Sequence, residues 1–406
     1  MSAKEMHVAL LTAGRDKPYA LGLAAALIES KITVDFLGSD LVDAPMLHNN
    51  PLVAFRNMRG DQAIDVALHR KIVRLLTYYV RLLTYAVSAG PKIFHILWNN
   101  KFEFFDRTLL MLFYRICGRR LVLTAHNVNA GERDGNDSSL NRLTLRIQYK
   151  LADHIFVHTN QMRQALEKEF KVPSKKCSVI PFGINSTVPS TTLDGSRARA
   201  LLGLNPSEKV LLFFGNIAPY KGLEALIQAM GELAKEGKRY RLVVAGRVKD
   251  CDAYWREVQA DIERLGLSAD VLLHIQYVPD EETEIYFKAA DVTVLPYKHV
   301  FQSGVLFLAY NFGLPVIATD VGSLKEEIIE GETGFVCRAE DTRDLADAIR
   351  RYFASDLYKD LPARRQRIRD FACTRYSWSR VAAITMNIYA KLDPAMTEIR
   401  SHRVAL

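Results

Sequence analysis

The sequence predicts an α/β protein built from two doubly wound domains in tandem. Three observations carry this prediction. Short β-rich runs alternate with helical patterns along nearly the whole chain, the alternation pauses once near the middle, and it then restarts. The runs are largely apolar, as in parallel strands that helices cover on both faces. At 406 residues the chain is also too long for one ordinary core.

The first half contains six runs of strand type. MHVALLTA at 6–13 is the first, and a helical pattern over 20–30 separates it from ITVDFLG at 32–38. The other four lie at 91–98, 120–128, 153–159 and 176–183. Residues 185–207 then concentrate Ser, Thr, Pro and Gly, which predicts a linker followed by a short helix.

Six further runs follow the linker, and a helical pattern ends the chain. The runs lie at 209–216, 240–247, 271–278, 291–297, 315–320 and 334–339. Apolar residues at helical spacing predict a final helix over 376–392. We therefore expect a Rossmann-like N-terminal domain at 1–187 and a Rossmann-like C-terminal domain at 188–375. The region 376–406 should form a helix that crosses back to the N-terminal domain, followed by a tail.

Composition restricts the class of protein. A hydrophobic content of 49% and a charged content of 25% are typical of a soluble globular protein. The sequence contains no run of about 18 apolar residues, so it predicts no transmembrane helix. The N-terminus carries Glu5 and enters a strand directly, unlike a secretion signal. Five scattered cysteines without a CxxC pair favour a reducing compartment, hence a cytoplasmic location.

The basic excess lies entirely in the first half. Residues 1–185 hold 25 Lys and Arg against 16 Asp and Glu, whereas the remainder holds 29 against 30. This asymmetry predicts an anionic partner for the first half: a membrane surface, a phosphorylated acceptor or nucleic acid. Nucleic acid is not expected, because the sequence has no module that interleaves aromatic and basic residues.

The segment 69–88 predicts a strongly amphipathic helix. Its polar side chains fall on one narrow stripe, formed by Arg70, Arg74, Thr77, Arg81, Thr84 and Ser88. Two interpretations compete. The helix lies on an anionic bilayer, or its wide apolar face packs on the sheet while the stripe is solvated. The second arrangement is commoner and is slightly favoured, although the basic excess keeps a peripheral contact with the inner face of a membrane open.

Residues that follow the strands are the candidate site residues, because ligands bind beyond the carboxyl ends of strands in open α/β sheets. In the second half these are Gly215, Asn216, Lys221, Gly246, Arg247, Tyr297 and the segment 320–323. In the first half they are Gly14, Arg15, His126, Asn127 and the segment 181–183. We expect the two sets to face each other across an interdomain cleft that holds a nucleotide-linked substrate.

Two features of the second half suit a diphosphate. Ser303-Gly304 opens a predicted helix, where unpaired N–H groups and a small residue allow a phosphate to approach. The alternative is an ordinary serine N-cap. Lys221 opens a predicted helix over 221–233, and cations are disfavoured there unless an anion binds. The alternative is a surface lysine.

No metal or nicotinamide site is expected. Asp250-Cys251-Asp252 has the Asp-x-Asp pattern of some metal sites, but it lies in a polar loop that is more simply explained as solvated. No GxGxxG follows the first strand, which argues against a dehydrogenase.

The chain resembles the retaining GT-B glycosyltransferases of the large family 4. In the second half FFGNIAPYKGLEALIQAM, VVAGR, ADVTVLPY, GLPVIATDVGSLKEEIIEGETGFV and YSWSRVAAITMNIY carry the resemblance. LTAHNV, ADHIFVHTNQMRQAL and VIPFGI carry it in the first half. The resemblance covers nearly the whole chain, and the order and spacing of the segments are more specific than any one of them.

The resemblance implies that a sugar moves from a nucleotide diphosphate donor, expected to be a UDP- or GDP-sugar, to a glycan, lipid-linked or other acceptor with retention of configuration. No cofactor is implied. Lys221 matches the family's diphosphate-binding lysine, His126 the histidine near the transferred sugar, and Glu326 the acidic residue after a turn. Gly14, Tyr297, Gly304 and Val305 complete the expected donor side. Arg15, Asn127 and Arg133 form the expected acceptor side.

The sequence departs from the family pattern at three positions. Asn216 stands where the family has an arginine, and Arg247 is the cation that could replace it. The family's two glutamates align with Val300 and Leu308, so Gln302 and Ser303 are the nearest polar substitutes, in a Gln-Ser-Gly variant. Two alternatives therefore stay open: a non-catalytic GT-B-like binding subunit, and a sugar-nucleotide epimerase on the same fold.

Overall fold

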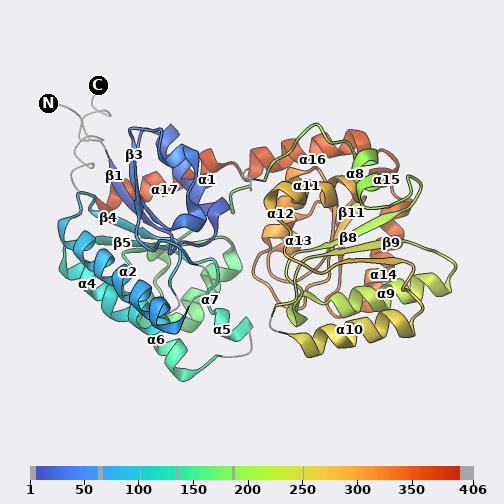
Figure 1. Cartoon of the computed structure of the whole chain (residues 1–406), viewed down its shortest axis with the longest axis horizontal. Helices are drawn as coiled ribbons and strands as arrows, with labels where there is room; N and C mark the ends of the chain where they lie inside the picture. Colours follow the sequence, from blue (N-terminus) through green and yellow to red (C-terminus); the bar gives the residue numbers. More distant parts are fainter. Residues whose placement is uncertain are drawn as a thin grey trace. The chain divides into compact units, whose positions relative to one another are not determined.

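The protein forms two compact units, each with one parallel sheet between layers of helices (Figure 1). The structure is a computed structural model that describes residues 6–62, 67–100, 102–133, 137–184, 188–249 and 251–393. Unit 1 contains the chain up to Gly183 and again from Tyr376, and unit 2 runs from Ile184 to Arg375. The predicted fold class is confirmed. The predicted boundary at residue 187 falls among residues 185–187, outside the described residues.

Unit 1 is built on a seven-stranded sheet whose strands all run parallel. The spatial order is β3 (Val53–Asn57), β2 (Thr33–Gly38), β1 (His7–Leu11), β4 (Ile93–Ile96), β5 (Arg120–Thr124), β6 (His154–Val157) and β7 (Cys177–Val179). The order reverses between β1 and β4, which is the topological switch point of a doubly wound sheet.

Helices cover both faces of this sheet. They are α1 (Lys17–Glu29), α2 (Leu68–Ser88), α3 (Glu103–Phe105), α4 (Met111–Ile116), α5 (Ala130–Arg133), α6 (Ser139–Leu151), α7 (Asn160–Phe170) and α17 (Trp378–Leu392), with a π-helical turn at Asp106–Leu110. Adjacent residues of β4 separate the faces. Phe94 packs against Tyr85 of α2 and Tyr114 of α4, whereas His95 bonds to Tyr389 of α17.

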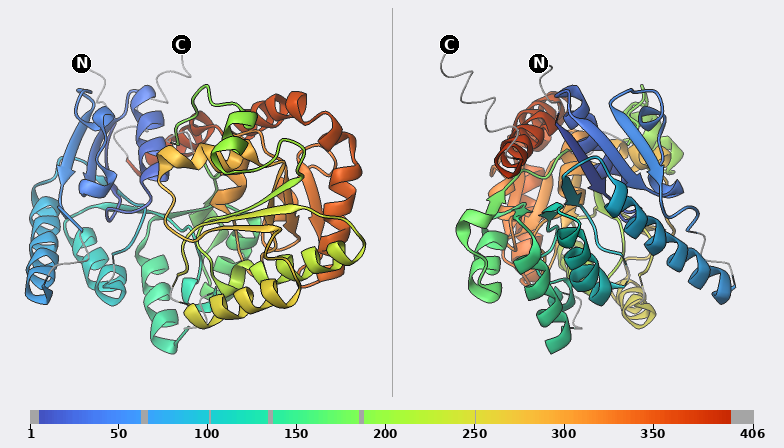
Figure 2. Two further views of the ribbon diagram at one scale, coloured as in Figure 1. Left: turned by 45° about the vertical axis from the view of Figure 1, so that its right-hand side comes forward. Right: turned by 90° about the vertical axis from the view of Figure 1, so that its left-hand side faces the viewer.

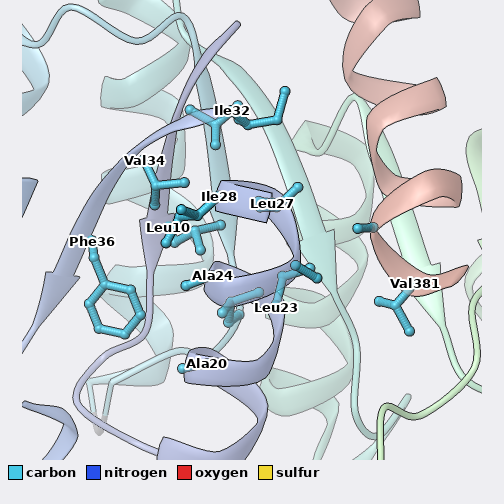
Figure 3. Close-up of a cluster of buried hydrophobic side chains, with 14 of the residues drawn as sticks. Leu10, Ala20, Leu23, Ala24, Leu27, Ile28, Ile32, Val34, Phe36 and Val381 are labelled. Carbon is cyan, nitrogen blue, oxygen red and sulfur yellow. The ribbon is translucent and has the colours of Figure 1, made fainter. Parts of the chain in front are cut away.

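The core on the α1 side ties the C-terminal helix to unit 1 (Figure 3). Strand residues such as Leu10, Val34 and Phe36 pack with Leu23 of α1 and with Val381 of α17. Trp378 fits against two glycines, since a Cβ added at Gly22 or Gly183 would lie 2.1 or 2.4 Å from its ring. The prediction that the last helix crosses back to the N-terminal domain is therefore confirmed.

Unit 2 repeats the plan with six strands. Their order is β10 (Val271–His274), β9 (Arg241–Ala245), β8 (Val210–Phe214), β11 (Val292–Leu295), β12 (Val316–Thr319) and β13 (Gly334–Cys337). Its helices are α8 (Gly195–Leu201), α9 (Leu223–Lys235), α10 (Asp252–Arg264), α11 (Asp280–Ala289), α12 (Gly304–Asn311), α13 (Leu324–Glu327), α14 (Thr342–Ala354), α15 (Asp356–Lys359) and α16 (Leu361–Arg375). The switch point lies between β8 and β11.

Two local features differ from the sequence prediction. Strand β3 was not predicted, because it is an edge strand that is only partly buried and ends in the polar pair Arg56-Asn57. Lys221 does not open α9. It ends a short 3₁₀ turn, Pro219–Lys221, and Gly222 takes the N-cap position of α9.

Helix α2 contradicts the favoured interpretation of segment 69–88. Its buried residues are Tyr78, Leu82, Tyr85 and Ala86, so most of its apolar surface is not packed on the sheet. Part of the polar stripe is held against unit 1 instead: Arg74 pairs with Asp61 at 3.0 Å, and Arg81 donates to the carbonyl of Met58. The idea that the sheet covers the wide apolar face is therefore wrong. Among the helices in the described ranges, none has the length and hydropathy needed to cross a membrane.

Candidate active site

Lys221 is a buried cation at the switch point of unit 2. Its side chain is 7% exposed, and its Nζ lies 5.5 Å from the centroid of the Tyr297 ring. A Cβ added at Gly215 would lie 3.1 Å from that Nζ, so the ammonium rests against the end of β8. Burial lowers the pKa of Lys221, and no described carboxylate pairs with it. A desolvated cation without a counterion is poised to bind an anion.

Two glycines bring the strand ends around Lys221 together. Gly222 has φ 67°, and a Cβ there would lie 2.0 Å from the carbonyl oxygen of Pro296. Gly246 has φ 149°, and a Cβ there would lie 2.0 Å from the carbonyl oxygen of Gly215. Only glycine permits these approaches at such φ values. The ends of β8, β9 and β11 are therefore held at close range by residues without side chains.

The first turn of α12 presents unpaired N–H groups. Ser303 occupies the N-cap position but forms no capping bond, because its hydroxyl donates to Tyr297 Oη at 3.4 Å. The Leu306 N–H bonds to the Ser303 carbonyl, whereas the N–H groups of Gly304 and Val305 have no partner among the described residues. The ordinary N-cap alternative is therefore wrong for the side chain of Ser303. Val305 also lies beside Gly215, 3.6 Å from its added Cβ.

The turn after β12 packs on the segment that leads into α12. The Ser323 N–H donates to the carbonyl of Phe301 at 2.9 Å, and a Cβ at Gly322 would lie 2.0 Å from the carbonyl oxygen of Val300. Gln302 Oε1 and Ser323 Oγ are both buried without a hydrogen-bond partner in the described part of the chain. This places two unused polar oxygens near the start of α12, while Glu326 is exposed in α13.

Asn216 and Arg247 are also brought together. Arg247 Nε donates to Asn216 Oδ1 at 3.3 Å, so the guanidinium is held at the end of β8 although its side chain is exposed. Asn216 stands where the family pattern has an arginine, and it thus lies next to a cation that follows the adjacent strand β9.

In unit 1 the loop after β1 has a strained backbone. Ala13, Gly14 and Asp16 all have positive φ, at 52°, 66° and 48°. A Cβ at Gly14 would lie 2.8 Å from Ser39 Cβ, and the positive φ also favours glycine at this position. Asp16 caps α1, and burial raises its pKa to about 6. Arg15 lies in the same loop and is exposed. Backbone strain of this kind often clusters at functional sites.

His126 follows β5 and lies in an aromatic cluster. Its ring stacks on Trp98 with centroids 4.3 Å apart and planes 3° apart, and it meets the Tyr19 ring in a T-shaped arrangement with centroids 4.5 Å apart. His126 Nδ1 is 3.1 Å from His158 Nε2, and His158 Nδ1 is 3.3 Å from the carbonyl oxygen of Ile180. His126, His158 and the carbonyl of Ile180 are thus joined by two hydrogen bonds in series.

This series of hydrogen bonds determines the tautomer of His126. A carbonyl only accepts, so His158 Nδ1 carries a proton. Burial lowers the pKa of His158 to about 4, so the ring is neutral and its Nε2 accepts a proton from His126 Nδ1. His126 Nε2 is then a bare lone pair, buried and without a partner among the described residues. Burial also holds the pKa of His126 well below its usual value, so His126 is a neutral hydrogen-bond acceptor.

The remaining predicted residues are less informative. Asn127 Oδ1 accepts the N–H of Asn129 at 3.0 Å, and Arg133 ends α5. Residues 134–136 of the loop after His126 and Asp250 of the Asp-x-Asp pattern lie outside the described residues. Within the described ranges, no group of three or more His, Cys, Asp or Glu side chains is arranged to hold a metal ion.

Sequence reasoning missed Trp98, His158 and Tyr19 as partners of His126. A signal was present for two of them, because Trp98 and His158 stand at the carboxyl ends of predicted strands 91–98 and 153–159. Tyr19 directly precedes the helix predicted over 20–30, lies in α1 of the structure, and carries no such signal.

Two family models match the chain. The model described as Glycosyltransferase Family 4 matches residues 18–188, and the model described as Glycosyl transferases group 1 matches residues 208–355. The D-inositol 3-phosphate glycosyltransferase of Paenarthrobacter aurescens is 29% identical over 59% of this chain and 57% of that protein. The one from Corynebacterium aurimucosum is 26% identical over 66% of each chain. The matches thus span between about half and two thirds of these curated relatives.

Solved structures share the fold. Sucrose-phosphate synthase from Thermosynechococcus elongatus has a TM-score of 0.74 at 20% identity, covering 96% of this chain and 99% of that one. Anabaena HepE in complex with UDP has a TM-score of 0.71 at 17% identity, covering 95% of this chain and all of that one. WaaG, a glycosyltransferase of lipopolysaccharide biosynthesis, has a TM-score of 0.62 at 16% identity, covering 96% of this chain and 100% of that one.

Proposed function

We propose an activity for this chain on the premise that it belongs to the glycosyltransferases of family 4. The model of that family matches its first half, and the model of Glycosyl transferases group 1 matches its second half. The proposed activity is the transfer of a sugar from a nucleotide diphosphate donor to a glycan, glycolipid or other acceptor, with retention of anomeric configuration. The observation that carries it is Lys221, a buried ammonium with no counterion among the described residues. It lies next to the N–H groups of Gly304 and Val305, which also have no partner in that part of the chain.

These groups suit a leaving diphosphate. Negative charge develops on the phosphate as the bond from the sugar C1 breaks, and preorganised positive charge in a buried site stabilises it strongly. Lys221 supplies a full charge, the first turn of α12 supplies N–H donors, and Arg247 adds an exposed cation. HepE, which shares the fold, was solved with UDP and with UDP-glucose, so UDP-sugars are the first donors to test, followed by GDP-sugars.

We assign His126 to positioning the sugar. Its bare Nε2 can accept a hydrogen bond from a sugar hydroxyl, and its low pKa means that it is not a proton donor at neutral pH. Gln302 Oε1 and Ser323 Oγ are buried acceptors that have no partner within the described ranges, and we propose that they replace the two missing glutamates in binding donor hydroxyls. We also propose Glu326, Tyr297 and Gly14 as donor-binding residues.

Retention is proposed to follow a front-face path. The bond from C1 to the phosphate oxygen breaks, the acceptor oxygen bonds to C1 on the same face, and the acceptor proton passes to the leaving phosphate. In this scheme the diphosphate itself is the base, which agrees with assigning no carboxylate nucleophile.

The acceptor is proposed to bind unit 1 near Arg15, Asn127 and Arg133. The basic excess of the first half favours an acceptor that carries phosphate or is linked to lipid on the cytoplasmic face of a membrane. The names of the curated relatives make D-inositol 3-phosphate a natural first acceptor to test.

The test is a thermal-shift screen with UDP-, GDP-, ADP- and dTDP-sugars, because a tight donor raises the melting temperature. The best donor is then incubated with acceptors, and NMR reads the anomeric configuration of the product. Binding without turnover of any acceptor or water would favour the non-catalytic binding subunit, an alternative that the missing glutamates motivate. Epimerised nucleotide formed without an acceptor would identify an epimerase instead.

A further inference from the structure

Helix α2 exposes a continuous apolar face to solvent. We define the α2 face as Leu68, Ile72, Val73, Leu76, Val80 and Val87, whose side chains are 50–72% exposed. Leu68, Ile72, Leu76 and Val80 recur every fourth residue, so they lie along one side of the helix. Contiguous exposed apolar surface of this kind marks a binding surface rather than an ordinary solvent-facing helix.

The exposure follows from how α2 sits on unit 1. Tyr78, Leu82 and Tyr85 are buried against the sheet, and the hydroxyl of Tyr79 donates to Asp106 at 2.9 Å. Arg74 and Arg81 are tied to the segment 57–61 on another side of the helix. The apolar side chains of α2 extend further around the helix than the part of unit 1 that packs on it. The α2 face therefore contacts neither the sheet nor the segment 57–61.

Helices α4 and α6 of unit 1 also expose apolar side chains. Figures 1 and 2 show α2, α4 and α6 as neighbouring helices of unit 1. Leu112 and Ile116 of α4 are 46% and 74% exposed, and Leu140 and Leu143 of α6 are 57% and 51% exposed. In the described part of unit 2, by contrast, the large exposed apolar side chains are scattered, namely Leu201, Leu273, Tyr277 and Ile329.

The charge of these three helices is entirely positive. Helices α2, α4 and α6 contain no Asp or Glu, whereas they contain Arg70, Lys71, Arg74, Arg81, Arg115, Arg142, Arg146 and Lys150. Four of these cations, Arg70, Lys71, Arg146 and Lys150, are exposed and form no ion pair within the described residues. An apolar helix face beside unpaired cations fits an anionic lipid surface, where the side chains enter the acyl boundary and the cations meet headgroups.

We propose that unit 1 docks on an anionic bilayer through the α2 face, with Arg70 and Lys71 against lipid headgroups. The contact is peripheral and reversible. It goes beyond the proposed sugar transfer and does not rest on it, because a protein that transfers nothing would still bind vesicles. If the acceptor is linked to lipid, the same contact would bring unit 1 to the surface that carries it.

The test is co-sedimentation of the full chain with phosphatidylcholine vesicles, with and without about 30% phosphatidylglycerol. We expect binding to the anionic vesicles, little binding to the neutral ones, and weaker binding as salt rises. The variant Ile72→Ser/Leu76→Ser/Val80→Ser should bind the anionic vesicles at least about tenfold more weakly, since it removes three exposed apolar side chains from the bilayer contact. Arg70→Gln/Lys71→Gln should weaken binding and reduce its dependence on salt.

A matched variant in unit 2, Leu201→Ser/Tyr277→Ser, removes side chains of similar exposure, 60% and 66%, and should bind like the wild type. All substituted positions are exposed, and circular dichroism verifies that each variant is folded. Three outcomes would overturn the proposal: no binding to anionic vesicles, equal binding by the triple-serine variant, or a dimer in sedimentation velocity that the triple-serine substitution abolishes. The last outcome would mean that a second copy covers the α2 face.

Discussion

Replacing Lys221 by methionine should weaken donor binding without weakening the fold. Methionine has a similar length and no charge, so it fills the space beside Gly215 and Tyr297 without a buried ammonium. Burial lowers the pKa of Lys221, so the folded state holds this proton less tightly than the unfolded state does. Stability attributable to Lys221 therefore rises with pH only above its folded pKa, and at neutral pH the charged group is a net cost.

The expected sizes follow from the site. The Lys221→Met variant should melt no lower than the wild type at pH 7, and a gain of about 1 kcal/mol would raise the melting temperature by about 2–4 °C for a domain of this size. Its turnover should fall by about 10²–10³, as when one preorganised donor to a developing anion is removed. The wild type should gain about 2.7 kcal/mol of stability from donor at 100 times Kd, and the variant should lose most of this gain at the same donor concentration.

The assay pairs differential scanning fluorimetry, with and without donor, with initial rates of transfer. Lys209→Met is the matched control. Lys209 also contacts aromatic rings, with its Nζ 5.3 Å from the Phe353 centroid, but it precedes β8 at the opposite end of the strand. The reasoning is refuted if Lys221→Met keeps turnover within about threefold of the wild type, or if it melts several degrees lower without donor.

Three further predictions concern stability. Burial lowers the pKa values of His95 to about 3 and of His154 and His158 to about 4, so these groups are neutral when folded and take up protons on unfolding. As the pH drops from 6.5 towards 4, the free energy of unfolding of unit 1 should fall by up to about 1.4 kcal/mol per histidine and pH unit, and its melting temperature should fall with it; a flat profile would contradict this. Gly246→Ala places a Cβ 2.0 Å from the Gly215 carbonyl oxygen, so urea unfolding should show a loss of about 1–3 kcal/mol, and wild-type stability would disprove the close approach. Gly22→Ala places a Cβ 2.1 Å from the Trp378 ring and should lower the free energy of unfolding by about 1–3 kcal/mol. It should also make the chain near residue 376 more sensitive to limited proteolysis. An unchanged cleavage pattern would show that α17 does not depend on this contact.

The sequence predicted the fold well because its signals are local. An apolar run bounded by glycine or polar residues specifies a buried strand, and twelve such runs coincide with observed strands. The glycines after β8 and β9 also marked the strand ends where the candidate donor residues gather. Strand β3 was missed because it is a partly buried edge strand and carries a weaker apolar signal.

The sequence by itself determined the order of the described strands except β3, the two parallel sheets, and the positions of Lys221, Ser303 and His126 after strands. The tertiary structure alone decided three properties of these residues: Lys221 lacks a counterion among the described residues, the Ser303 hydroxyl bonds to Tyr297 rather than capping α12, and His126 is a neutral acceptor. It also decided that the α2 face is exposed. The physical reason is that backbone conformation follows from neighbours in sequence, whereas charge state, hydrogen bonding and exposure depend on groups that only folding brings together.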